Sequence, residues 1–116
     1  MAHFNKVVIQ GRLGKNPESR GDEGGDIKSC KFSLAVNEYA GVDRNDVTHW
    51  FNVAAYDKQA KYICDFANQG DEITFCGRLR ADKYQNSVGE EQVYNYIKVE
   101  QIINIRKKKE ESKQNG

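Results

Sequence analysis

The sequence predicts an all-β fold with one helix, and three observations indicate this. Apolar and polar residues alternate over several segments, as they do in half-buried strands. A single segment carries apolar residues at helical spacing, and Gly-, Asp- and Asn-rich stretches separate these elements. The predicted strands run from about Lys6 to Leu13, Ile27 to Tyr39, Val47 to Tyr56, Glu72 to Ala81 and Val93 to Ile105.

The helix is predicted between the third and fourth of these strands. Asp57 is suited to the N-cap, and Gly70 stands where a C′ glycine is expected. The apolar residues that recur at i, i+3, i+4 and i+7 are Ala60, Ile63, Cys64 and Ala67. Five strands with a helix between strands 3 and 4 is the order of the five-stranded Greek-key OB-fold barrel.

Two segments are predicted to lie outside regular structure. The stretch from Gly14 to Asp26 is rich in turn-forming residues and predicts a long, mobile loop. Residues 106–116 form a basic, Lys-rich stretch that predicts a disordered C-terminal tail. The predicted organisation is therefore one OB-fold domain over residues 1–105, which would bind single-stranded DNA by the argument below, followed by this tail.

The charge of the chain is nearly balanced but unevenly distributed. Its 116 residues hold 18 Lys and Arg against 17 Asp and Glu, a net charge of +1. Residues 106–116 carry five bases against two acids, which leaves residues 1–105 at −2. A neutral total therefore does not exclude a locally basic surface.

Several classes of function lack support in the sequence. No apolar run reaches the length of a membrane span and none follows the start Met, so we expect a cytoplasmic protein without a membrane partner. Cys30, Cys64 and Cys76 form no CxxC pair, and His3 and His49 are isolated, so neither a disulfide framework nor a metal site is expected. No nucleophile and base or paired carboxylates stand at a useful spacing, which predicts no enzyme, no cofactor and no small-molecule substrate.

Alternation separates the two faces of each strand. The predicted inward residues are Phe32, Leu34, Val36, Phe51, Val53, Ala55, Ile73, Phe75, Gly77 and Leu79. The opposite face gathers cations and aromatic residues: Lys31, Tyr39, Trp50, Tyr56, Arg78, Arg80 and Tyr84. Near the adjoining loops lie Arg12, Lys15 and Lys83, which are candidates through proximity alone.

Such a face is typical of proteins that bind single-stranded nucleic acid without sequence preference. Cations follow the phosphates, and aromatic rings stack on bases at about 1–3 kcal/mol each. Any one of these tyrosines could equally be a half-buried packing residue with its hydroxyl in water. The set as a whole favours binding, because Trp50 and Tyr56 share a face and Tyr84 shares one with two arginines.

Four segments resemble the bacterial single-stranded DNA-binding protein family over about residues 5–105. They are NKVVIQGRLGKNPESR (Asn5 to Arg20), FSLAVNEY (Phe32 to Tyr39), THWFNVAAYDKQAKYICDFANQGDEI (Thr48 to Ile73) and CGRLRADKY (Cys76 to Tyr84). The resemblance implies an OB-fold subunit that binds and protects single-stranded DNA in replication, recombination and repair. It also implies a homotetramer built from dimers, with a dimer as the alternative.

By position, the resemblance assigns base stacking to Trp50, Tyr56 and Tyr84. The family's fourth aromatic falls at Ala40, one residue after Tyr39, so the part played by Tyr39 stays open. Family members end in an acidic tip that recruits other enzymes, whereas this sequence ends in a basic stretch. We therefore expect a tail-less member, similar to phage, plasmid or accessory proteins, that does not recruit partners through such a tip.

The alternative function is a protein-interaction module. It would be a tail-less OB-fold component of a primosome or replication complex, similar to primosomal replication protein B. A basic distal loop with few aromatics would favour it, but the segment from Asp82 to Gln92 holds one base against three acids. Binding of single-stranded DNA is therefore the stronger prediction.

Overall fold

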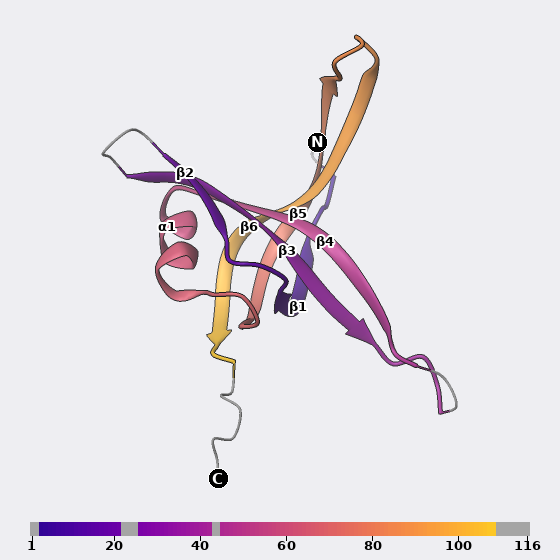
Figure 1. Cartoon of the computed structure of the whole chain (residues 1–116), viewed down its shortest axis with the longest axis vertical. Coiled ribbons are helices and arrows are strands. Elements are labelled where there is room, and N and C mark those ends of the chain that lie inside the picture. Colours follow the sequence, from indigo (N-terminus) through magenta and orange to yellow (C-terminus); the bar gives the residue numbers. More distant parts are fainter. Residues whose placement is uncertain (1–2, 22–25, 43–44, 109–116) are drawn as a thin grey trace.

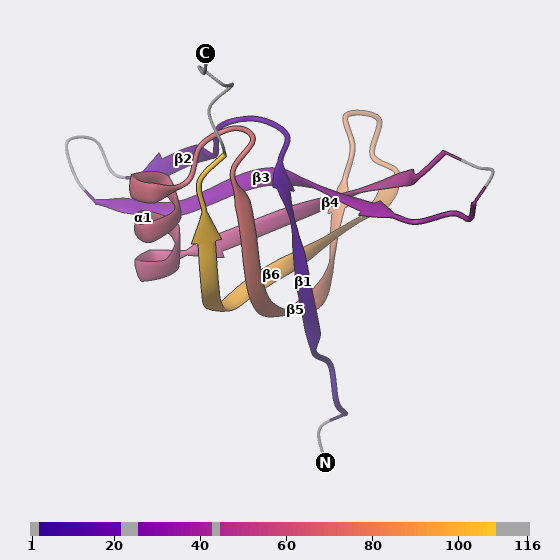
Figure 2. The same cartoon turned by 90° about the horizontal axis from the view of Figure 1, so that it is seen from below.

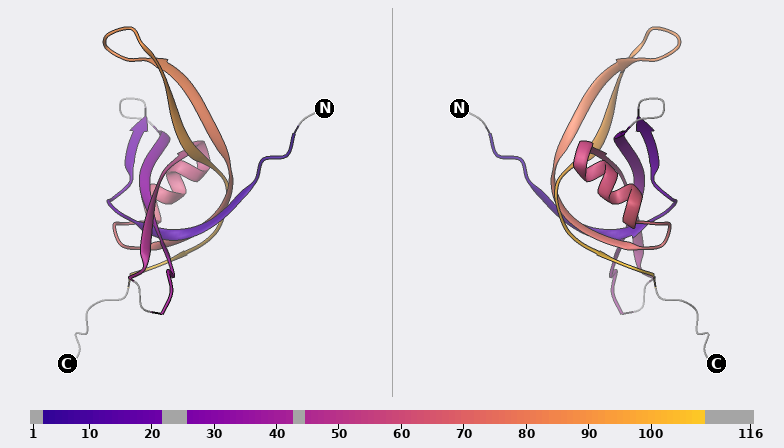
Figure 3. Two further views of the ribbon diagram at one scale, coloured as in Figure 1. Left: turned by 90° about the vertical axis from the view of Figure 1, so that its right-hand side faces the viewer. Right: turned by 90° about the vertical axis from the view of Figure 1, so that its left-hand side faces the viewer.

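The computed structural model describes residues 3–21, 26–42 and 45–108. Its elements are β1 (Val7–Leu13), β2 (Glu18–Gly21), β3 (Ile27–Glu38), β4 (Val47–Tyr56), α1 (Asp57–Phe66), β5 (Glu72–Gln85) and β6 (Glu91–Arg106). The strands form one sheet in the order β1-β5-β6-β4-β3-β2, and β1 also pairs with β3, which closes a barrel (Figure 3). The predicted all-β class with one helix is confirmed.

The barrel carries two hairpin arms that project in different directions (Figure 1). One arm is formed by β3 and β4, which pair from Ser29 and Tyr56 outward to Glu38 and Val47. The other is formed by the outer parts of β5 and β6, which pair as far as Gln85 and Glu91. All pairings are antiparallel except that of β4 with β6.

The core lies inside the barrel and is closed at one end by α1. Its largest fully buried side chains are Leu34, Val53, Ile63, Ile73 and Phe75, together with Cys30. Helix residues Ala60, Ile63 and Ala67 belong to this core cluster, as their helical spacing predicts. Packing around this core therefore keeps the sheet curved, and the outer surface of the barrel stays accessible to a ligand.

The prediction of a loop from Gly14 to Asp26 is wrong for part of that segment. Glu18–Gly21 forms β2, which pairs with β3 through Glu18 and Lys31 at one end. All four residues of β2 are exposed, so the strand has no apolar alternation by which it could be recognised. Residues 22–25 lie outside the described part of the chain.

Both ends of α1 differ from the prediction. Asp57 is the first helical residue, and Tyr56 occupies the N-cap without a side-chain capping bond, because β4 runs straight into the helix. Asp57 itself makes the change of direction with φ of 52°, a conformation that Asp tolerates better than most residues. At the other end the C-cap is Ala67, and Gly70, with φ of 89°, serves the turn into β5.

The end of β6 is fastened to the barrel by Asp71, a residue that is only 4% exposed. Its carboxylate accepts hydrogen bonds from the backbone N–H of Asn68 (2.9 Å), the backbone N–H of Lys108 (2.8 Å) and Lys107 Nζ (3.0 Å). Burial by itself raises the pKa of Asp71, but these donors and the Lys107 charge bring the pKa below its ordinary value of 3.8. Arg106 is the last residue of β6, so residues 106–108 of the predicted tail belong to the barrel and its fastening.

Residues 109–116 of the predicted tail lie outside the described part of the chain. Within the residues that the structure describes, no helix is long and apolar enough to cross a membrane.

Candidate nucleic-acid interface

A row of cations crosses the outer face of four neighbouring strands. Lys31 of β3 pairs with Ala54 of β4, Ala54 pairs with Lys98 of β6, and Lys98 pairs with Arg78 of β5. Directly paired residues point to the same side of a sheet, so these three cations share one face. We call Lys31, Lys98 and Arg78 the cation row, and Ala54 supplies a small side chain in the middle of it.

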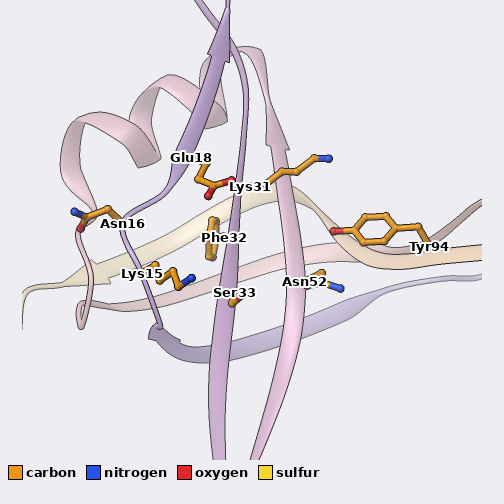
Figure 4. A pocket seen from close by; sticks show the side chains of 8 residues that line it. All are labelled: Lys15, Asn16, Glu18, Lys31, Phe32, Ser33, Asn52 and Tyr94. Carbon is orange, nitrogen blue, oxygen red and sulfur yellow. The ribbon is translucent and has the colours of Figure 1, made fainter. Parts of the chain in front are cut away.

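Lys31 and Tyr94 lie beside an open hollow of about 210 Å³ (Figure 4). The Lys31 ammonium stands 5.6 Å from the centroid of the Tyr94 ring, within the range of a cation–π contact. Lys15 and Asn16 approach from the segment that follows β1, and Ser33 and Asn52 line the hollow from β3 and β4. Glu18 and Phe32 complete the lining, so the hollow combines two cations, one carboxylate, two rings and neutral hydrogen-bonding groups.

A second cation–π contact lies further along the cation row. The Lys98 ammonium stands 5.6 Å from the centroid of the Tyr56 ring. Tyr56 ends β4 and is half-buried, so part of its ring remains accessible. Each of these contacts places a positive charge next to an aromatic ring. A nucleotide needs such a pair, because its phosphate binds the cation and its base stacks on the ring.

Tyr96 supports the Tyr94 ring from within the face. The two rings stack with centroids 5.5 Å apart and planes 28° apart. Tyr96 is 7% exposed, and its hydroxyl donates to Asp82 Oδ2 at 2.9 Å. Burial first, and then hydrogen bonding with Asp82 and Tyr56, raise the pKa of the Tyr96 hydroxyl. Tyr96 therefore stays protonated and fixes the position of its neighbour.

Trp50 lies on the β3–β4 arm, and its side chain is largely exposed at 60%. One edge of its ring rests on Gly14, where an added Cβ would stand 2.6 Å from a ring carbon. The absence of a side chain at position 14 thus makes room for the edge of the indole beside the backbone that follows β1. The exposure of Trp50 leaves part of its ring accessible to a base.

Arginines and a tyrosine of β5 continue the face. Arg78, Arg80 and Tyr84 pair with Lys98, Tyr96 and Gln92 of β6, which confirms that they share one side of the strand. Arg78 Nε contacts Glu100 Oε2 at 2.5 Å, and Arg80 stands 3.9 Å from Asp82. Both guanidinium groups remain half-exposed, and Tyr84 is 51% exposed.

The three remaining predicted site residues are Lys83, Tyr39 and Arg12. Lys83 points to the other side of β5 and forms an ion pair with Glu91 at 3.7 Å. Tyr39 follows the end of β3 and is 71% exposed on the arm. Arg12 reaches across to donate to the Gly70 carbonyl at 3.0 Å, at the end of the barrel where β6 finishes.

Two inward assignments were also wrong. Leu79 is 57% exposed and Phe51 is 36% exposed. Both lie where their strands leave the barrel and enter a hairpin arm, so neither face of the strand is covered. Alternation predicts which residues share one side of a strand. Whether that side is buried depends on how far the strand extends beyond the barrel.

Sequence reasoning missed three members of the face, namely Tyr94, Tyr96 and Lys98. The signal was present, since they alternate in VYNYIKV within the predicted strand from Val93 to Ile105. Their side chains join Lys31 and Tyr56 only because β6 lies parallel to β4, a pairing between segments distant in sequence. The faces of this strand cannot be assigned until that neighbour is known.

The fold and this face define a class, an OB-fold barrel with an open surface of alternating cations and aromatic rings. The model of the Single-strand binding protein family matches residues 4–105 of the chain. The chain belongs to this family.

Individual relatives agree with that assignment. A "Single-stranded DNA-binding protein" of Thermosynechococcus vestitus is 35% identical over 83 residues, covering 72% of this chain and 66% of the relative. One of Neisseria meningitidis is 36% identical over 90 residues, covering 74% and 51%. "Single-stranded DNA-binding protein 1" of Nostoc sp. is 30% identical over 100 residues, covering 85% and 81%. The chain thus spans about two thirds of the first relative and half of the second.

A solved structure of a Plasmodium falciparum SSB complex with ssDNA has a similar fold. The TM-score is 0.73 at 23% identity, and the match covers 92% of this chain and 96% of the other. At this identity the likeness supports the OB-fold barrel and no more.

Proposed function

We propose that the chain binds single-stranded DNA without sequence preference and without catalysis. The observation that carries this proposal is the cation row of Lys31, Lys98 and Arg78, interleaved on one open face with Trp50, Tyr56 and Tyr94. The names of the relatives support it, since each describes a single-stranded DNA-binding protein.

The strand would lie along the face with its phosphates toward the cations and its bases toward the rings. Lys15, Lys31, Lys98, Arg78 and Arg80 would neutralise phosphates, while Trp50, Tyr56, Tyr94 and Tyr84 would stack on bases. Because the rings offer only their faces, all four bases fit equally well. Protection of single strands during replication, recombination and repair in the cytoplasm, by a homo-oligomer, belongs to this proposal.

A titration with oligo-dT tests it through the fluorescence of Trp50, which is the single tryptophan of the chain. We expect quenching at low salt, and much weaker binding of duplex DNA. Trp50→Ala should weaken binding by about 1–3 kcal/mol with a nearly unchanged salt dependence. Arg78→Ala should instead lower the slope of log K against log salt by about 0.7, the value for one phosphate on a single strand.

Lys58→Ala provides a matched control, because Lys58 is an exposed cation of α1. It should leave both affinity and slope unchanged. If oligo-dT does not quench Trp50 at low salt, the stacking assignment is wrong. If no single strand binds at all, the protein-interaction alternative takes its place.

A further inference from the structure

A second group of cations lies at the end of the barrel where β6 finishes. Arg12, Arg106, Lys107 and Lys108 line an open hollow of about 520 Å³ beside Gly70. They come from β1, from the end of β6 and from the two residues that follow it. We call these four residues the terminal cluster.

The terminal cluster has more positive charge than its neighbours neutralise. Arg106 faces Glu72 at 3.7 Å, and Lys107 is bound to Asp71. Arg12 donates to a carbonyl, and the Lys108 side chain lies over Gly70, where an added Cβ would meet it at 2.8 Å. Among the described residues, no carboxylate lies within ion-pair distance of Arg12 or Lys108. Two charges are therefore available to an anion.

The terminal cluster is held in place rather than carried on a loose end. Lys107 donates to the Phe66 carbonyl and to Asp71, and the Lys108 N–H donates to Asp71 Oδ1. The Lys107 side chain and the Lys108 backbone are thereby held against the turn between α1 and β5. The segment that carries Lys107 and Lys108 is therefore already fastened to the barrel, which lowers the cost of ordering it when a ligand binds.

The terminal cluster adjoins Trp50 through a short connected path. Arg12 pairs with Ala35, and Ala35 pairs with Trp50, so all three share the outer side of the sheet. The Gly70 N–H donates to the Leu13 carbonyl at 2.9 Å, which joins the hollow to the Gly14 backbone under Trp50. Figure 2 shows the end of β1, the turn before β5 and the end of β6 at the same end of the barrel.

We propose that the terminal cluster binds the phosphates of nucleotides that continue past Trp50, so that each subunit contacts a longer single strand than the cation row alone would hold. This inference rests on the proposed function. The inference adds a path for the nucleic acid to the proposed function. The DNA strand would run from Lys98 past Lys31 and Trp50, and then to Arg12 and Lys108. The ligand is the phosphodiester backbone, because the hollow offers cations and no aromatic ring.

The test compares two double variants that each remove two positive charges. Arg12→Gln with Lys108→Gln changes the terminal cluster, and Lys58→Gln with Lys61→Gln changes the exposed side of α1. Affinities are measured for oligo-dT from about 5 nucleotides, near the small end of OB-fold site sizes, up to about 20. Thermal unfolding of each variant establishes that the barrel is intact.

We expect the terminal-cluster variant to bind the shortest oligonucleotide like the wild type, with normal Trp50 quenching. For the longest one it should bind about 5- to 10-fold more weakly, with a salt slope lower by about 1.4, which is two single-strand phosphates at 0.7 each. The α1 variant should match the wild type at every length. Arg12→Lys, which retains the charge, should restore most of the loss caused by a change at position 12.

Two results would overturn the inference while leaving the proposed function intact. One is a terminal-cluster variant that binds every length like the wild type. The other is an equal loss at every length, or the same loss in the α1 variant, which would reflect overall charge. Failure of the proposed function looks different, because the wild type itself would then bind no oligo-dT.

Discussion

Two aspartates contact β6 or the residues that follow it, and their surroundings differ. Asp71 is almost fully buried and receives three donors from residues 68, 107 and 108. Asp82 is half-exposed and receives the Tyr96 hydroxyl while facing Arg80. A buried carboxylate with all its bonds made stabilises the fold, whereas an exposed one can orient side chains that must meet a ligand. Asp71 therefore fastens the residues that follow β6, whereas Asp82 orients side chains on the proposed DNA-binding face.

Asp71→Ala should show the largest effect, and it should fall on stability. The change leaves the N–H groups of Asn68 and Lys108 without their acceptor and removes the Lys107 ion pair. We expect a loss of about 2 kcal/mol in the free energy of unfolding, measured by urea denaturation at one protein concentration. Asp65→Ala, which breaks only the exposed pair with Lys61, should cost at most about 0.5 kcal/mol. Equal losses of unfolding free energy in Asp71→Ala and Asp65→Ala would contradict the stabilising role of the buried carboxylate.

The pH dependence of stability should show whether the charge of Asp71 stabilises the fold. The pKa of Asp71 lies below its ordinary value of 3.8 in the folded protein. Its contribution is therefore complete above about pH 4 to 5 and is lost as the pH falls through the lowered pKa. The difference in unfolding free energy between the wild type and Asp71→Asn should shrink as the pH drops from 5 toward 2.5. A constant difference would mean that the charge of Asp71 has no part in the fastening.

Tyr96→Phe should act mainly on binding. Loss of the hydroxyl releases Asp82, which then competes with phosphates for Arg80 on the proposed DNA-binding face. We expect oligo-dT to bind about two- to fivefold more weakly, equivalent to roughly 0.5–1 kcal/mol for a half-exposed ion pair. Titration by Trp50 fluorescence measures this change. If Tyr96→Phe leaves the affinity unaltered but lowers the stability strongly, Asp82 would instead stabilise the fold, as Asp71 does.

Asp82→Asn should have the smallest effect and the opposite sign. The amide oxygen can still accept from Tyr96, while a negative charge is removed from the proposed DNA-binding face. Binding should therefore tighten by about twofold at low salt, and the gain should fade as salt screens the charges. Asp65→Asn removes the same charge from α1 and should change nothing. Weaker binding by Asp82→Asn would show that Asp82 needs its charge to hold Tyr96.

Much of this arrangement follows from local sequence, and the rest depends on distant pairing. Alternation predicts the shared side of Arg78, Arg80 and Tyr84, because two-residue periodicity holds in any strand. It cannot place Tyr96 beside Tyr56, because β4 and β6 come together only in the finished barrel. Nor can it reveal β2, whose four exposed residues are identified only by their pairing with β3.

The barrel is closed by two short seams. β1 meets β3 at Arg12 and Leu13, and β4 meets β6 at Val53 and Ala54. Seams of two residue pairs hold few hydrogen bonds, so amide hydrogens there should exchange with solvent sooner than those within the long β5–β6 hairpin. Lys98 belongs to the β4–β6 seam, and Lys31 pairs with Ala54 from the far side of β4, so a nucleic-acid strand that contacts both cations would tie β3 and β4 to β6 across this seam.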